Sequence, residues 1–182
     1  MKEYGFCGKE PLQVSLVSVT SQSITCSISE ESRRFYFSAI YGSNDGMERR
    51  QLWRHLQDIS NNLSTEPWIL AGDFNIISHP SESSKEEQEY TMDMRDFIAC
   101  LAQIAVFDHA YSGPYMTWSN HQAEGFIARK IDRVLVNGSW YTCFDQLMVE
   151  FLPPEISDHC PVVIQLQLEN YSPPKPFKFF SH

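Results

Sequence analysis

Apolar and polar residues alternate along residues 12–28 in two runs, at 14–16 and 24–28, separated by the polar turn 20–23. Alternation with a period of two is typical of strands with one buried face, so this pattern predicts a β-hairpin. A third strand is predicted over "FYFSAIY", which ends at Tyr41 and leads into the turn "GSNDG".

Two later segments carry apolar residues at helical spacing, which predicts two amphipathic helices. The first stripe consists of Leu52, Leu56, Ile59 and Leu63, and the second of Met94, Phe97, Ile98, Leu101 and Ile104. Between them, "WILAG" reads as a buried strand, and the Ser/Glu-rich stretch "SHPSESSKEEQE" is expected to be a solvated loop. Three more strands are predicted in "YMTWSN", "KIDRVLVN" and "CPVVIQLQLE".

The 182 residues, 42% of them hydrophobic, are enough for one globular domain with a sizeable core. We expect residues 1–169 to form the domain, and the proline-broken, aromatic tail 170–182 to be a flexible end or a linker toward a downstream region. No membrane-spanning run or signal peptide is present, which favours an intracellular, soluble chain. The five scattered cysteines are expected to be buried thiols.

The formal charge of −9 argues against strong unaided binding to phosphate backbones, which clustered Lys and Arg normally supply. Any phosphate chemistry would therefore need a metal cation.

The first candidate for chemistry is "GDFN", which follows the buried strand "WILA". In an extended segment Asp73 and Asn75 would share a face while Phe74 points into the core. The pair suits a carboxylate that orients or deprotonates water, beside an amide that donates to a phosphate oxygen. The alternative is a turn in which these side chains bond their own backbone.

Two further candidates are "ISDHCP" and "KIDRV". Asp158 and His159 are adjacent and would face opposite sides, so each needs its own partner unless the segment only caps a strand. Cys160 is expected in the core, because neighbouring residues diverge and a Cys-His dyad is unfavourable. Asp132, a lone acid in an apolar strand, needs a partner, which is either Arg129 or Arg133 or the histidine of the "SDH" segment, His159.

The ordered set "IYGSN", "LAGDFN", "YMTWSN", "KIDRVLVN" and "SDHCP" resembles the endonuclease/exonuclease/phosphatase superfamily, and within it the endonuclease domain of plant-type non-LTR (LINE) retroelements. The resemblance implies a deoxyribonuclease I-like α/β fold, a four-layer α/β/β/α sandwich. It also implies a hydrolase that uses Mg²⁺ or Mn²⁺ and acts on DNA.

Carried onto this sequence, the resemblance implies a role for each candidate. Asp73 would activate water and, with Asp158, bind the metal, while Asp132 and His159 would form the pair that stabilises charge on the phosphate. The phosphate contacts would come from Tyr41, Asn44, Asn75, His159 and Trp118, and Asn120 would help Trp118 to shape the loop beside the site.

The sequence departs from the family pattern in two places. Ser43 stands where the pattern usually has proline. The family also begins with a strand bearing a catalytic asparagine and then a strand ending in a glutamate metal ligand. None of the early glutamates, Glu3, Glu10, Glu30 and Glu31, matches that glutamate. We therefore expect a fold missing its first strands and helix, with the metal held weakly and activity weak or absent.

Two other functions stay open: a non-catalytic retroelement remnant, and a phosphatase acting on a small phosphorylated lipid or inositol. The resemblance names DNA as substrate, a reverse transcriptase region downstream and, for a functional element, the nucleus. It implies no membrane association, and the sequence indicates no protein partner.

Overall fold

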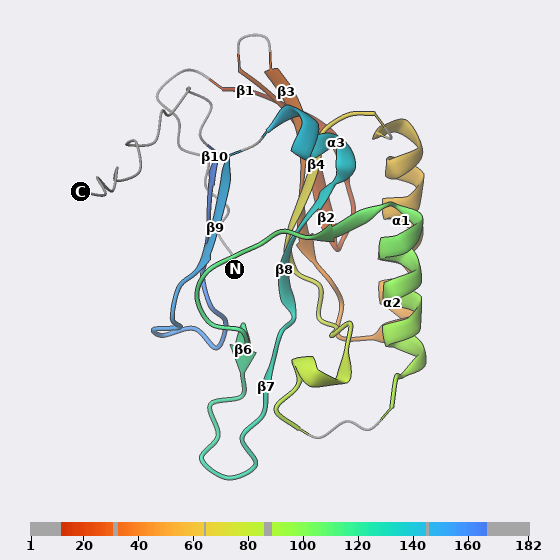
Figure 1. Cartoon of the computed structure of the whole chain (residues 1–182). Coiled ribbons are helices and arrows are strands. Elements are labelled where there is room, and N and C mark those ends of the chain that lie inside the picture. Colours follow the sequence, from red (N-terminus) through yellow and green to blue (C-terminus); the bar gives the residue numbers. More distant parts are fainter. Residues whose placement is uncertain (1–11, 31–32, 64, 86–88, 145, 167–182) are drawn as a thin grey trace, which may run out of the picture.

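The computed structural model describes residues 12–30, 33–63, 65–85, 89–144 and 146–166. Its main sheet has the strand order β1-β2-β3-β4-β8-β5 (Figure 1). The bounds are β1 Gln13–Val19, β2 Ser23–Glu30, β3 Arg33–Tyr41, β4 Trp68–Asp73, β5 Val106–Asp108 and β8 Asp132–Asn137. Strand β4 runs parallel to β3, whereas β8 is antiparallel to both β4 and β5.

The predicted hairpin is confirmed as β1 and β2, which pair antiparallel with Val14 opposite Ile28. Strand β4 is buried at all six positions because both faces of the sheet are covered. This explains why its sequence reads as an unbroken apolar run.

Both predicted helices are confirmed as α1 Gly46–Leu63 and α2 Met92–Gln103, which lie side by side on one face of the main sheet (Figure 1). Their apolar stripes pack on Leu70 and Leu135 of the sheet. Helix α2 begins after Thr91, whose hydroxyl oxygen accepts a hydrogen bond from Met94 N. Ile98, predicted to belong to the apolar stripe, is instead 38% exposed because it falls beside the buried line of Met94, Phe97 and Cys100.

On the opposite face stands a second sheet, formed by β9 Leu147–Phe151 and β10 Val162–Leu166 (Figure 1). Ile69 and Val136 of the main sheet meet Val149 and Phe151 of the second in one buried cluster. The predicted face-to-face arrangement of sheets within a mixed α/β fold is therefore confirmed. Among the described residues no helix covers the outer side of β9 and β10.

The remaining elements are short. They are η1 Pro80–Glu82, β6 Trp118–Ser119, β7 Ala128–Arg129 and α3 Gly138–Cys143. Strands β6 and β7 form a small hairpin below the main sheet, and α3 follows β8 directly (Figure 1). The strands β5, β7 and β9 and the helices η1 and α3 were not predicted. No helix in the described part of the chain is long and apolar enough to cross a membrane.

Two expectations from the sequence need correction. The loop predicted to be solvated contains Glu82, which is only 5% exposed because it pairs with the buried Arg133. Of the cysteines, Cys100 and Cys160 are buried as expected, but Cys143 is exposed on α3. Cys7, the boundary near 169 and the tail 170–182 lie outside the described residues, so the domain boundary stays a prediction.

Candidate active site

Three strand ends meet at one edge of the main sheet. Because β3 and β4 are parallel and Tyr41 pairs with Asp73, both strands end at the same place. The antiparallel strand β8 begins there, with Asp132 directly opposite Asp73. The sheet topology thus brings Tyr41, Asp73 and Asp132 together although they are distant in sequence.

Two glycines allow the ends of β3 and β4 to approach closely. Gly72 has a φ of +138°, and a Cβ there would lie 2.1 Å from the carbonyl oxygen of Ile40. At Gly42 a Cβ would lie 2.6 Å from Phe74 O, and Gly42 N donates to Asp73 O at 2.7 Å. Side chains at either position would push the two strand ends apart.

His159 joins the two carboxylates at this edge. Its Nδ1 lies 2.8 Å from Asp132 Oδ2, and its Nε2 lies 3.8 Å from Asp73 Oδ2. Asp73 and Asp132 are 1% and 6% exposed, so both carboxylates are buried. The prediction that Asp132 needs a partner is confirmed, and His159 is one. Arg133, the adjacent alternative, binds Glu82 and Asp108 instead.

A buried threonine places this histidine, and sequence reasoning missed it. Thr117, which is 0% exposed, accepts hydrogen bonds through Oγ1 from Asp132 N at 2.9 Å and Ile131 N at 3.1 Å. Its carbonyl accepts from Cys160 N at 2.8 Å. Thr117 therefore fastens the histidine segment to the start of β8. No local pattern marks it, because threonine is common in strands.

The turn after Asp73 combines both interpretations of "GDFN". Asp73 Oδ1 accepts from Asn75 N at 2.8 Å, as in the turn alternative, while Oδ2 faces His159. Asn75 has a φ of +54° and donates through Nδ2 to Gly42 O at 2.9 Å. Phe74 is fully buried, as predicted. Since β4 ends at Asp73, a turn rather than strand alternation places Asn75.

Asp158 and His159 have separate partners, as expected. Asp158 Oδ2 accepts a hydrogen bond from Trp118 Nε1 at 2.9 Å, and this bond holds the pKa of the Asp158 carboxyl below its ordinary value. Asp158 is exposed and lies outside the cluster of Asp73, Asp132 and His159. Its role as a metal ligand stays a prediction.

The other predicted residues lie at the end of β3, in the turn after it and in the β6–β7 hairpin. Tyr41, at the end of β3, is 57% exposed, and Asn44 is exposed in the following turn. Asn120 closes the loop of the β6–β7 hairpin, because its Oδ1 accepts from Ile127 N at 3.0 Å and its Nδ2 donates to Gly125 O at 3.0 Å.

The donor set fits a divalent cation. One donor atom each from Asp73, Asp132 and His159 lies within 4.8 Å of the others. Two buried carboxylates side by side repel one another unless a positive charge lies between or beside them. Carboxylate oxygens are the protein ligands that Mg²⁺ prefers. His159 already supplies part of this compensation when it is protonated.

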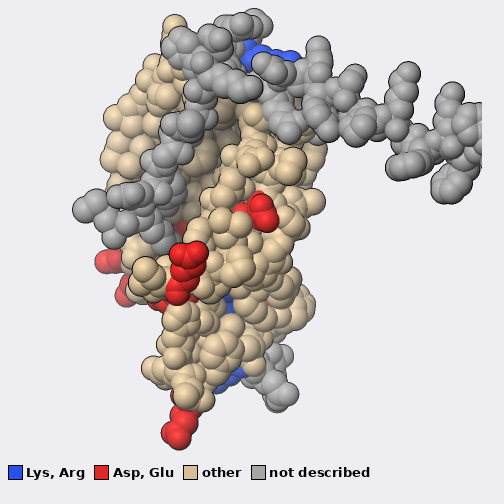
Figure 2. All heavy atoms as spheres, turned by 90° about the vertical axis from the view of Figure 1, so that its left-hand side faces the viewer, with Lys and Arg blue, Asp and Glu red and all other residues tan. Residues whose placement is uncertain are grey.

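Basic groups are few on one face of the described part of the chain (Figure 2). On the face seen in Figure 2, acidic groups are scattered over the lower half and basic groups show at few points. Several basic side chains pair with acids, namely Arg34, Arg49, Arg50, Lys130 and Arg133. The arrangement agrees with the expectation that phosphate binding would need a cation.

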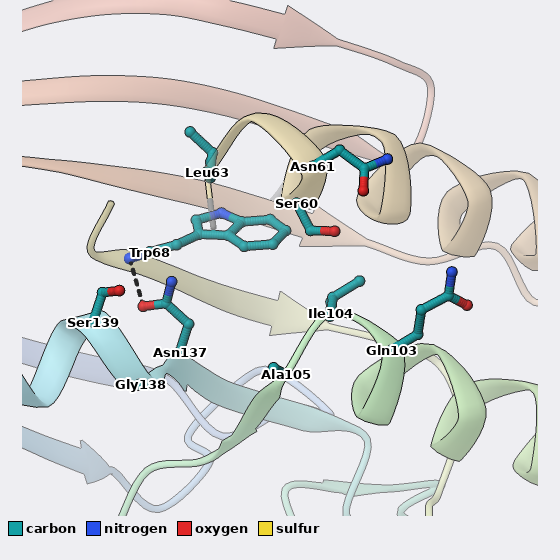
Figure 3. A pocket seen from close by; sticks show the side chains of 10 residues that line it. All are labelled: Ser60, Asn61, Leu63, Trp68, Gln103, Ile104, Ala105, Asn137, Gly138 and Ser139. Atoms are coloured by element: carbon teal, nitrogen blue, oxygen red, sulfur yellow. Dashed lines mark hydrogen bonds between the residues drawn. The ribbon is translucent and has the colours of Figure 1, made fainter. Parts of the chain in front are cut away.

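A hollow of about 530 Å³ lies elsewhere, between the C-terminal ends of α1 and α2 (Figure 3). Trp68 and Asn137, which line it, lie at the opposite ends of β4 and β8 from Asp73 and Asp132. The hollow is therefore separate from the strand ends that carry the acidic cluster.

Known structures share this fold. The endonuclease domain of TRAS1, a telomere-specific non-LTR retrotransposon, superposes with a TM-score of 0.67 at 14% identity, covering 86% of this chain and 70% of that domain. Beta toxin from Staphylococcus aureus with bound magnesium ions gives 0.56 at 15% identity, covering 80% and 58%. Sphingomyelinase C from Streptomyces griseocarneus gives 0.53 at 14% identity, covering 80% and 57%.

The chain thus spans little more than half the length of the last two proteins. No curated protein sequence matches it. Residues 9–159 do match a family profile, and this span contains the two glycines, the acidic cluster and the turn after β3. The chain belongs to the Endonuclease/Exonuclease/phosphatase family.

Proposed function

We propose that this chain is a metal-dependent phosphodiester hydrolase domain of the DNA endonuclease type, derived from a retroelement. The observation that carries the proposal is the buried cluster in which His159 contacts Asp132 and faces Asp73. The family comprises nucleases and phosphatases, and a retrotransposon endonuclease shares the fold. The order and wording of the sequence motifs also favour a retroelement origin.

In this proposal the side chains divide the steps of the reaction among them. Asp73, with one oxygen fixed by Asn75 N, orients and deprotonates the attacking water through the other. His159, oriented by Asp132, stabilises negative charge that develops on the phosphate. Asn75, Tyr41, Asn44 and Trp118 contact phosphate oxygens. Mg²⁺ or Mn²⁺ would be held by Asp73 of the acidic cluster, with Asp158 as a further carboxylate, and would supply charge neutralisation in the transition state.

We expect the metal to be held weakly and the activity to be low. Mg²⁺ sheds its water reluctantly and needs near-octahedral oxygen geometry. The small number of carboxylates at this site does not enforce that geometry. A retroelement domain would act in the nucleus beside a reverse transcriptase region, and both of these remain proposals.

Nicking of supercoiled plasmid tests the function. The chain should convert plasmid to the open circle slowly, with a rate that increases with Mg²⁺ or Mn²⁺ into the millimolar range. Asp73→Asn and His159→Gln should abolish nicking, whereas His55→Gln, which changes a histidine bonded to Ser18, should not.

Two outcomes would contradict the proposal. If no metal concentration supports nicking, the chain is a non-catalytic remnant. If the chain instead releases phosphate from a small phosphorylated lipid or inositol without nicking DNA, it is a phosphatase.

A further inference from the structure

The turn between β3 and α1 is held by three side chains. Every polar atom of Ser43 has a partner: its N donates to Gln22 Oε1 at 2.8 Å, its O accepts from Arg49 Nη1 at 2.7 Å, and its Oγ donates to Glu48 Oε2 at 2.6 Å. We call Gln22, Glu48 and Arg49 the Ser43 clamp.

Gln22 connects the turn to the β1–β2 hairpin. It is 8% exposed, its Nε2 donates to Glu48 O at 3.0 Å, and its backbone O accepts from Tyr41 N at 2.9 Å. One buried side chain therefore bonds to the turn and to α1, while its backbone bonds to the end of β3. A buried amide with both of its polar atoms bonded has little freedom to move.

Arg49 connects the turn to α2. It is 5% exposed, and its Nη2 lies 3.1 Å from Asp93 Oδ2 in the first turn of that helix. The helices approach closely here, because a Cβ on Gly46 would lie 2.2 Å from Asp93 Oδ2. The guanidinium thus binds the turn to a rigid helix pair rather than to another loop.

The turn is also fastened to the acidic cluster on its other side. Gly42 N donates to Asp73 O at 2.7 Å, and Gly42 O accepts from Asn75 Nδ2 at 2.9 Å. The backbone of Gly42 and Ser43 is therefore bonded to β4 on one side and to the clamp on the other. Tyr41 is exposed at its pairing position with Asp73, and Asn44 is exposed at the other end of the turn.

We infer that Gln22, Glu48 and Arg49 are positioning residues that hold the 41–44 turn so that Tyr41 and Asn44 bind a phosphodiester beside Asp73. The inference rests on the proposed function. None of the three touches the phosphate; each acts through the backbone or hydroxyl of Ser43. Displacing a binding group by about 1 Å can cost on the order of a hundredfold in rate, so the clamp matters although it lies outside the site.

The test compares Gln22→Met with Thr25→Val. The first removes both hydrogen bonds of the amide at similar volume. The second removes the buried bond between Thr25 Oγ1 and Ser38 Oγ, 2.8 Å long, in the same sheet but away from the turn. Three quantities are measured: amide hydrogen exchange at Ser43, affinity for a short DNA duplex with Mg²⁺, and Mn²⁺ affinity.

In Gln22→Met, exchange at Ser43 should accelerate at least tenfold and duplex affinity should fall about tenfold. Mn²⁺ affinity should stay constant, since the acidic cluster comes from other elements. Thr25→Val should change neither exchange at Ser43 nor duplex affinity. Glu48→Ala should also accelerate exchange at Ser43 and weaken duplex binding, but by less than Gln22→Met. Because Glu48 is exposed, this variant remains informative if Gln22→Met fails to fold.

Unchanged exchange at Ser43, or faster exchange with unchanged duplex affinity, would overturn the inference. Plasmid nicking reports separately on the proposed function. If the parent chain binds the duplex but never nicks plasmid, the proposed hydrolase function is refuted. Hydrogen exchange at Ser43 and duplex affinity then still test the positioning role of the Ser43 clamp.

Discussion

At the scale of single residues, His159 is held by one carboxylate and faces another. Its Nδ1 contacts Asp132 at 2.8 Å, which leaves Nε2 directed to Asp73 at 3.8 Å. The hydrogen bond made by one ring nitrogen fixes what the other can do. Asp132 therefore determines how the imidazole approaches the site without facing a substrate itself.

Asp132→Asn should preserve the size of the side chain but remove its charge. An asparagine amide can turn its NH₂ toward Nδ1 and reverse the orientation of the ring's protons. We expect the nicking rate to fall about a hundredfold or more. Single-turnover nicking measures it, with the surface variant Asp58→Asn as control. A rate within threefold of the parent would contradict the role of Asp132.

The bond from Trp118 to Asp158 gives a prediction about protonation. Because the indole N–H favours the carboxylate and lowers the pKa of Asp158, Trp118→Phe should raise that pKa toward its ordinary value. A depressed carboxyl pKa stabilises the fold above the unfolded pKa, and this contribution is lost as pH falls through the folded pKa. NMR titration of the Asp158 side chain measures the shift. An unchanged titration would show that another contact sets it.

At the scale of elements, a buried ion cluster fastens η1 to β8. Arg133 binds both Glu82 and Asp108, and Lys130 lies 3.3 Å from Asp108. Burial alone would raise the pKa of Glu82, but Arg133 and the bonds from Ser78 lower it below its ordinary value. Arg133 follows Asp132 on β8 and binds Glu82 of η1. The cluster therefore anchors η1, in the loop after Asn75, beside the start of β8.

Glu82→Gln should destabilise the protein by about 3 kcal/mol, because it leaves Arg133 buried with one partner fewer. Since the pKa of Glu82 is lowered on folding, its contribution is complete above the unfolded value and disappears as pH falls through the folded value. Urea unfolding from pH 7 down to pH 3 should show the parent and the variant converging. A constant difference across that range would assign the effect to packing.

The hairpin, α1 and α2 could be predicted from their periodicity, and β4 and β8 from their apolar runs. Strand β5 has three residues and α3 has six, too few to show a period. Asp73, Asp132 and His159 could be found because each stands where an apolar strand begins or ends. Thr117, the Ser43 clamp and the burial of Glu82 could not, since each depends on partners that only the folded topology brings close.

At the scale of the whole molecule, the charge of −9 limits how DNA can be held. Several described basic side chains already pair with acids, so we expect Lys and Arg to neutralise only about two phosphates. With a slope near −0.9 per contact, affinity should fall only about tenfold between 50 and 200 mM salt. Removing Mg²⁺ should weaken binding more than that salt change does. Fluorescence anisotropy with a labelled duplex measures both effects, and a slope typical of six or more contacts would refute a metal-mediated interface.

The strand order also constrains when the protein can fold during synthesis. Strand β8 lies between β4 and β5, yet it is translated after both. Until residue 137 leaves the ribosome, β4 has an unpaired apolar edge and β5 has no strand to pair with among the described elements. Both partners of His159 would then be fixed only once β8 inserts. The nascent chain therefore carries an aggregation-prone edge from the synthesis of β4, which ends at Asp73, until β8, which ends at Asn137, is available, and chaperone demand should peak in this interval.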